Sequence, residues 1–105
     1  MPDDRSGCLQ DSHWSGGMIG YFPSYALGSA YGVQMLNKMQ EQLGDVFQDV
    51  ANGDLSKVTG WLKENIHTHA SFRKPVELFE SVCGKFDAKF FTDYLTEKYT
   101  ALYEL

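Results

Sequence analysis

A short stretch near the start of the chain gathers residues that could do chemistry together. Asp11, His13 and Trp14 stand within four positions, and the glycine pair Gly16 and Gly17 follows. In an extended backbone, residues 11 and 13 point to the same side, so a carboxylate there can fix the imidazole tautomer and raise its basicity. Glycines let a backbone run beside a ligand without obstruction by side chains. The stretch is a candidate site, although a capped loop in which Asp11 accepts a hydrogen bond explains the same residues.

The composition excludes several functional classes. The 105 residues carry a formal charge of −5, whereas a protein that binds nucleic acid needs a clustered basic face. No stretch approaches the ~18 apolar residues of a membrane span, and the first residues lack the basic and apolar regions of a secretory signal. Cys8 and Cys83 stand far apart, which favours two reduced thiols over a disulfide. We expect a cytoplasmic protein whose partners are neither nucleic acid nor membrane.

The elements that must position this site are predicted to be helices. Residues 1–20 are rich in glycine and show neither the strand period of two nor the helix period of 3.6, so they indicate a loop. Later segments carry apolar residues at helical spacing and have recognisable ends. The expected N-terminal signals are Asp45, Asp54, Pro75 and Asp87, and the expected stops are Asn52-Gly53 and Gly84. We predict an all-α fold, with four or five helices over residues 24–105 in a single domain.

Two apolar stripes are expected to form most of the helical packing. The long helix that starts near Ser24 carries one stripe, made of Leu27, Tyr31, Met35, Met39 and Leu43. The final helix carries a broader one, made of Phe91, Leu95, Tyr99 and Leu102 and widened by Phe90, Tyr94 and Tyr103. One or two short neighbours cannot cover so broad a sector.

Two glycines in the long helix also point to a larger body. Gly28 and Gly32 lie in its interior, where each costs about 1 kcal/mol relative to alanine. Close approach of another backbone is the predicted reason for them. Together with the broad apolar face of the final helix, they predict either a homo-oligomer or a missing N-terminal part that covers this surface.

One motif resembles a known family. Residues 7–14, GCLQDSHW, fit the pattern GxxQDxHW of the carboxypeptidase Taq family, the thermostable metallocarboxypeptidases. The later segments SGGMIGYFPSYALG, WLKENIH, ELFESVCGKFD and YLTEKYTALYEL are similar to the same enzymes, so the resemblance covers effectively the whole chain. Cys8, Ser12 and Ala70 depart from the pattern, and Ala70 stands where family members tend to have glycine.

The resemblance implies that the chain is the C-terminal portion of a helical enzyme about five times longer. Such enzymes release single amino acids from peptide C-termini, using a zinc-type divalent metal held by an HExxH helix and a downstream Glu. This sequence contains no HExxH, so we expect it to bind no metal and to be inactive alone. His67 and His69 do not replace the motif, because residues two apart on a helix are separated by about 200°.

The resemblance also assigns roles to the residues of the first stretch. In related helical metallopeptidases a His and a Tyr donate hydrogen bonds to the oxyanion of the tetrahedral intermediate. His13 and Tyr25 are expected to do so here, with Tyr21 as the alternative tyrosine, and Asp11 would orient His13. The residues expected to line the peptide groove or approach the substrate are Gln10, Trp14, Gly16, Gly17, Gly20 and Tyr21.

Three functional hypotheses remain open at this point. The leading one is the C-terminal portion of a metallocarboxypeptidase that is inactive alone. The second is one half of a split carboxypeptidase, in which another polypeptide supplies HExxH and this one supplies His13 and Tyr25. The third is a stand-alone interaction module that assembles into a homo-oligomer through the broad face of its last helix.

Overall fold

Helices form all the regular secondary structure in residues 3–7 and 9–104, which the computed structural model describes. In chain order they are η1 (Asp4–Ser6), α1 (Ser12–Ser15), α2 (Pro23–Leu43), α3 (Val46–Ala51), α4 (Ser56–Asn65), η2 (His67–His69), α5 (Pro75–Cys83) and α6 (Lys89–Tyr103). The all-α prediction is confirmed, with α2 to α6 as the five helices. None of the described helices is both long and apolar enough to cross a bilayer. Cys8 lies outside the described residues, so the state of the two thiols stays a prediction.

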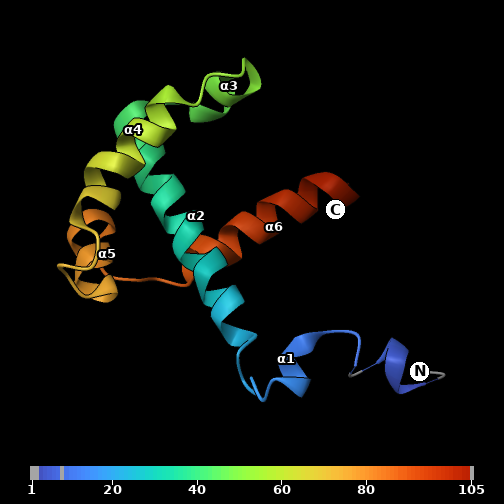
Figure 1. The fold of residues 1–105 in the computed structure, drawn as a ribbon. Helices are drawn as coiled ribbons and strands as arrows, with labels where there is room; N and C mark the ends of the chain where they lie inside the picture. Colours follow the sequence, from blue (N-terminus) through green and yellow to red (C-terminus); the bar gives the residue numbers. More distant parts are fainter. Residues whose placement is uncertain (1–2, 8, 105) are drawn as a thin grey trace.

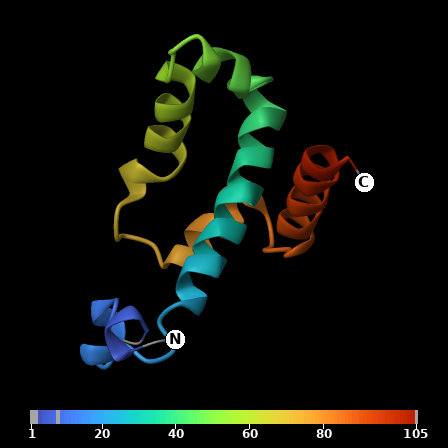
Figure 2. The ribbon, with the colours of Figure 1, turned by 90° about the vertical axis from the view of Figure 1, so that its right-hand side faces the viewer.

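Helix α2 runs through the middle of the molecule, and α3 to α6 each pack against it (Figure 1). After α2, the chain turns through α3 and returns along one side as α4 and α5, whereas α6 projects from the middle of α2 on another side (Figures 1 and 2). The segment that holds α1 lies at the N-terminal end of α2. One long helix therefore carries the candidate site at its start and the other helices along the rest of its length.

The main apolar core lies where α2, α3 and α4 meet. Met39, Val46 and Trp61 are each at most 5% exposed there. The indole N–H of Trp61 donates a 2.6 Å hydrogen bond to Oε1 of Gln42, so the buried ring leaves no donor unpaired. The residues packed around this core include Leu36, Leu43, Val58, Leu62 and Ile66. Val58, Leu62 and Ile66 thus face the core, whereas Leu55, just before α4, is exposed.

One buried polar side chain fixes the turn between α5 and α6. Gln34 of α2 is only 2% exposed. Its Nε2 donates to the carbonyl oxygens of Cys83 and Lys85 at 3.2 and 2.9 Å, and its Oε1 accepts from the backbone N–H of Asp87 at 3.0 Å. A single amide therefore satisfies three backbone groups, and it ties the start of α6 to the middle of α2.

Three aromatic rings pack α5 and the same turn against α2. The Tyr31 ring lies 4.5 Å from that of Phe79 and 4.8 Å from that of Phe86, measured between centroids. Both arrangements are inclined rather than face to face, which is the geometry that aromatic quadrupoles favour. This contact supports the hydrogen bonds of Gln34 on the neighbouring turn of α2.

The helix ends follow the signals in the sequence closely. Asp45, Asp54 and Asp87 each accept a hydrogen bond from the backbone N–H two residues later, at 3.0, 2.8 and 2.8 Å. Helix α5 begins at Pro75 and ends before Gly84, whose φ of 76° suits a glycine. Helix α4 itself begins at Ser56, so Asp54 lies one position further out than a formal N-cap.

The sequence predicted a loop over residues 1–20, and this prediction is only partly correct. Among the described residues they form η1 and the four-residue helix α1, and α2 begins at Pro23 rather than Ser24. A helix of one turn is too short to show an apolar period, so pattern reasoning cannot detect it. Its end signals, Asp11 before and Gly16 after, are present in the sequence.

The predicted stripe of α2 is only partly correct. Met39 is buried, but Leu27 is 52% exposed, and the buried positions on the N-terminal half are Ala30 and Gln34. The reason is the turn after α5, which packs on the side of α2 that carries the small Ala30 and the amide of Gln34. Apolar spacing alone could not reveal this side.

The backbone contact predicted at Gly28 and Gly32 is absent among the described residues. A Cβ atom added at either glycine would meet nothing within 4 Å. Helix α6 likewise contains no buried residue, despite its aromatic side chains. The described residues therefore leave Gly28 and Gly32 without a backbone neighbour and cover the apolar face of α6 only in part.

The molecule as a whole exposes more surface than a compact protein of its size. Its accessible surface is 8005 Å² and its radius of gyration is 17.8 Å. A compact monomer of this mass would expose about 5900 Å² and have a radius near ~13 Å. The difference, about 2000 Å², measures how much surface the helices leave open.

Replacing Gln34 tests the turn that it holds. Gln34→Leu is expected to lower the free energy of unfolding by about 2 to 4 kcal/mol, because three backbone groups lose their partner in a partly buried turn. Urea denaturation followed by circular dichroism measures this change. Gln40→Leu on the same helix is the control, with an expected change within about 0.5 kcal/mol. Equal losses in the two variants would contradict the role of Gln34.

Ala70 provides a second stability test, because its backbone suits glycine. Its φ of 44° and ψ of −130° lie in a region that is strained for any residue with a side chain. Ala70→Gly is therefore expected to raise the free energy of unfolding by about 1 kcal/mol, seen as a higher melting temperature. Ala30→Gly, inside α2, should lower it by about 1 kcal/mol. A lower melting temperature for Ala70→Gly would show that the strain is not relieved.

Candidate functional site

Two capping interactions hold the short helix α1 that presents His13. Asp11 precedes it in an extended conformation, and its carboxylate accepts the backbone N–H of His13 at 3.0 Å. At the other end, Gly17 has a φ of 74° and donates to the Trp14 carbonyl at 3.1 Å, while the Met18 N–H donates to the His13 carbonyl at 2.8 Å. This pair of bonds is the Schellman arrangement. The glycine pair thus ends the helix on which the imidazole is carried.

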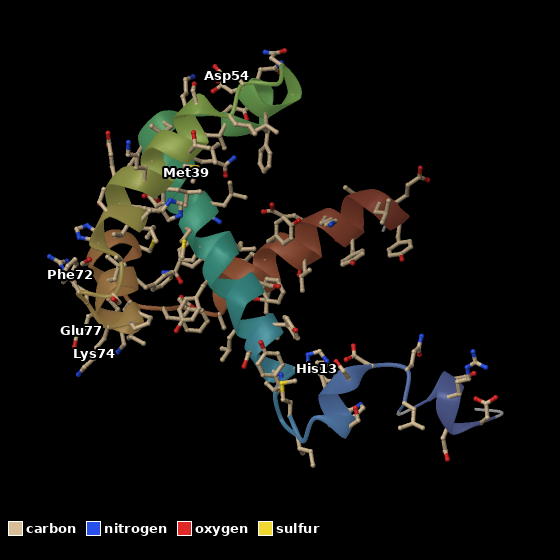
Figure 3. All side chains as sticks on the ribbon, in the orientation of Figure 1. His13, Met39, Asp54, Phe72, Lys74 and Glu77 are labelled. Carbon is tan, nitrogen blue, oxygen red and sulfur yellow. The ribbon has the colours of Figure 1, made fainter. Side chains whose placement is uncertain are left out.

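The side chains of Asp11, His13 and Tyr25 form a connected line. Nδ1 of His13 is in direct hydrogen-bond contact with Oδ1 of Asp11, and Nε2 lies 3.4 Å from the hydroxyl of Tyr25. Tyr25 belongs to the first turns of α2, and His13 lies where the N-terminal segment meets that helix (Figure 3). The structure therefore brings together the three residues to which the family resemblance assigned catalytic roles.

The electrostatics of the line assign its protons. The hydrogen bonds from the ring of His13, and then from its backbone N–H, hold the pKa of Asp11 below the ordinary 3.8. Partial loss of hydration, followed by the proximity of Tyr21, raises the pKa of Tyr25 above 10.0. At neutral pH the carboxylate is therefore ionised and the phenol keeps its proton. Because a carboxylate cannot donate, Nδ1 of a neutral His13 carries the hydrogen, and Nε2 accepts from Tyr25.

Aromatic rings enclose the imidazole and fix its plane. The ring of His13 stacks on Tyr21 at a centroid distance of 5.3 Å and lies 5.0 Å from Phe22. Trp14 packs edge-on against Phe22 at 5.3 Å. The side chain of His13 is consequently only 18% exposed, although its neighbours lie near the surface.

Phe22 is a site residue that sequence reasoning missed. It stands directly before Pro23, the first residue of α2, and three residues before Tyr25. That spacing places Phe22 and Tyr25 on one side of a helix start, which was the available signal. Its ring contacts His13, Trp14 and Tyr25. Phe22 therefore links the residues on α1 to the tyrosine on α2.

The remaining predicted site residues differ in how they are placed. Tyr21 and Trp14 belong to the aromatic cluster and are each partly exposed. Gln10 is exposed just ahead of Asp11, and its backbone N–H donates to the carbonyl of Gly7. Gly16 and Gly17 form the end of α1, as described above. The substrate contacts expected of these residues remain predictions.

The described residues offer no set of metal ligands. Within residues 3–7 and 9–104, no group of three or more His, Cys, Asp or Glu side chains could hold a metal ion. His67 and His69 lie in η2, on another element from His13. The site can orient and donate hydrogen bonds, but it does not supply coordination.

The geometry suits two hydrogen bonds to one oxygen. When His13 is protonated on both ring nitrogens, Nδ1 still donates to the ionised Asp11 and Nε2 becomes a donor. That donor and the Tyr25 hydroxyl are 3.4 Å apart, a separation at which both can reach one oxygen atom at about 2.8 Å. Two adjacent donors that can reach one oxygen atom form the kind of arrangement that stabilises an oxyanion.

The sequence matches one family over nearly its whole length. The model of the carboxypeptidase Taq (M32) metallopeptidase family matches residues 1–99. The chain belongs to this family. The resemblance to the carboxypeptidase Taq family is thereby confirmed.

Similar proteins place the chain within larger members of the carboxypeptidase Taq family. Carboxypeptidase 1 of Bacillus subtilis (strain 168) is 40% identical over 103 residues, which are 97% of this chain and 21% of that protein. Thermostable carboxypeptidase 1 of Thermus thermophilus is 39% identical over 102 residues, covering 96% of this chain and 20% of that protein. The solved structure "BsuCP Crystal Structure" matches with a TM-score of 0.87 and 38% identity, over 97% of this chain and 21% of that one. The chain spans about one fifth of the length of these relatives.

Titration of Asp11 tests the contact with His13. By carboxyl-carbon NMR, the midpoint for Asp11 is expected below 3.8, and it should return toward 3.8 in His13→Ala. Because the folded pKa is lowered, the contribution of this contact to stability is present above the unfolded pKa and is lost as pH falls through the folded pKa. Asp54, whose pKa is lowered by the hydrogen bond from Ser56 rather than by an imidazole, is the internal control, and its midpoint should be the same in both proteins. An unchanged Asp11 midpoint in His13→Ala would show that the imidazole does not set it.

Proposed function

We propose that this chain provides the oxyanion-binding donors of a metallocarboxypeptidase, with His13 and Tyr25 as the donors and Asp11 as the positioning residue. The observation that carries the proposal is the line from Asp11 Oδ1 through both nitrogens of His13 to the Tyr25 hydroxyl. Family membership supports peptide hydrolysis as the reaction, and the relatives named carboxypeptidases support release of residues from the C-terminus.

The proposed chemistry follows from the two donors. Attack on a peptide carbonyl converts its oxygen into an oxyanion, and the hydrogen bonds from Nε2 of His13 and from Tyr25 strengthen as that charge develops. Each preorganised donor of this kind is worth ~3 to 4 kcal/mol of barrier. Asp11 compensates the charge of the imidazolium, and the raised pKa of Tyr25 keeps its proton available for donation. The enclosing rings hold the donors in place and exclude water from one side of His13.

The family also implies a divalent metal of the zinc type, and the described residues of this chain do not supply a set of ligands for it. No ligand group occurs in the described residues, and the sequence contains no HExxH. We propose that the ligands and the general base belong to the other four fifths of the family fold. By this proposal the chain alone does not hydrolyse peptides.

The exposed residues around the donors form the proposed wall for the peptide. Trp14 and Tyr21 flank His13 and keep part of their rings at the surface. Gln10 lies beside them with an exposed side chain. Gly16 and Gly17 keep the end of α1 free of side chains on the approach to these rings.

A covalent chimera tests the roles of the donors. This chain would replace the matched fifth of Carboxypeptidase 1 from Bacillus subtilis, and release of C-terminal amino acids from a peptide would be measured. His13→Ala and Tyr25→Phe are each expected to lower kcat by roughly 10² to 10³, with little change in KM, because the donors act on the transition state. Tyr99→Phe, which removes an exposed hydroxyl on α6, is the matched control with unchanged kcat.

Two results would overturn this proposal. One is full kcat in the Tyr25→Phe chimera, which would remove the hydroxyl from the chemistry. The other is zinc-dependent release of C-terminal residues by the purified 105-residue chain, which would show a metal site within it.

A further inference from the structure

An apolar groove lies at the junction of α2, α3 and α6. Two hollows of about 600 and 360 Å³ share the side chains of Val33, Leu36, Phe47 and Tyr94. Phe47 is more than half exposed, so the groove is open to solvent. Its rim carries the charged residues Asp93, Glu97 and Lys98. An apolar floor with a charged rim is the usual composition of a protein interface.

Gly32 provides an independent indication of close contact at this groove. It lines the smaller hollow and lies inside α2, where glycine destabilises the helix relative to alanine. A Cβ atom there would touch nothing within 4 Å, so no described part of the chain accounts for the glycine. An incoming backbone that packs directly on α2 would account for it, because such contact excludes even a methyl group.

The comparisons and the exposed area indicate what occupies the groove. The open arrangement of helices matches one fifth of a solved structure with a TM-score of 0.87, so it is the shape of a part inside a larger folded body. The surface left open exceeds that of a compact monomer by about 2000 Å². A standard interface needs only about 800 Å² per partner. The molecule as a whole therefore leaves open enough area for at least one interface of standard size.

We infer that the groove of α2, α3 and α6 is the docking surface for the other four fifths of the carboxypeptidase Taq fold, and that a backbone of that part packs against Gly32. The inference holds whether the two parts belong to one polypeptide or to two. It rests on family membership and on the groove, and it does not depend on the catalytic roles of His13 and Tyr25.

The probe is Carboxypeptidase 1 of Bacillus subtilis without the fifth that this chain matches, tagged and co-expressed with the 105-residue chain. A complex of one copy each is expected, and its dissociation constant can be measured by titrating the labelled chain. Gly32→Ala should raise the melting temperature of the isolated chain, because alanine favours the helix, and weaken the complex by roughly tenfold or more. A misfolded variant would have a lower melting temperature, so misfolding cannot produce the higher melting temperature and the weaker binding together.

Gly60→Ala is the matched control. Gly60 also lies inside a helix with nothing within 4 Å of an added Cβ atom, but on α4 and away from the groove. This variant should raise the melting temperature in the same way and leave the dissociation constant within about twofold. Hydrogen exchange in the wild-type complex should slow at residues 29–36 and 90–98 and stay unchanged at 67–73.

Three results would overturn the inference. They are the absence of a one-to-one complex, unchanged binding in Gly32→Ala, and a stable homo-oligomer of this chain that protects residues 29–36 without the probe. In the last case the groove binds a second copy instead. Because binding is scored without activity, complex formation together with full kcat in the Tyr25→Phe chimera would count against the proposed function and not against this surface.

Discussion

The three hydrogen bonds of the Gln34 amide are the interaction on which the arrangement of the helices depends. Helix α6 packs against α2, but it contains no buried residue, and its Phe91 and Leu95 are only partly buried. The amide ties the turn before α6 to the middle of α2. From that point α6 projects away from α2, and the groove exists because the two helices diverge there. A polar residue in the interior therefore sets the shape of an apolar surface.

At the other end of α2, a single carboxylate joins folding to the orientation of the site. The same Oδ1 atom of Asp11 accepts from the backbone N–H of His13 and contacts its Nδ1. The first contact starts α1, and the second fixes the tautomer of the imidazole that α1 carries. The order of a one-turn helix and the alignment of a candidate catalytic group are thus consequences of one residue.

The sequence predicted those features that follow from local chemistry. The helical spacing of apolar residues, together with the signals at helix ends, located the five longer helices. The motif resemblance selected Asp11, His13 and Tyr25, which the structure places in contact. The catalytic roles themselves came from the resemblance and remain proposals. Helix α1 was missed because a single turn has no period. Gln34 was missed because its partners are backbone atoms about fifty residues away, and no local pattern encodes such a contact.

The continuity of α2, a single helix from Pro23 to Leu43, has a consequence for how an assembled protein would be aligned. Tyr25 and Gly32 lie on this one helix, seven residues apart, which is about 10 Å along the axis. A polypeptide that meets the backbone at Gly32 is therefore held at a fixed offset from the Tyr25 hydroxyl, with no hinge between them. If the partner shifted along α2 by a single helical turn, the Tyr25 hydroxyl would be misplaced by about 5 Å relative to it. The position of the hydroxyl therefore depends on how accurately the partner packs against Gly32, two turns away.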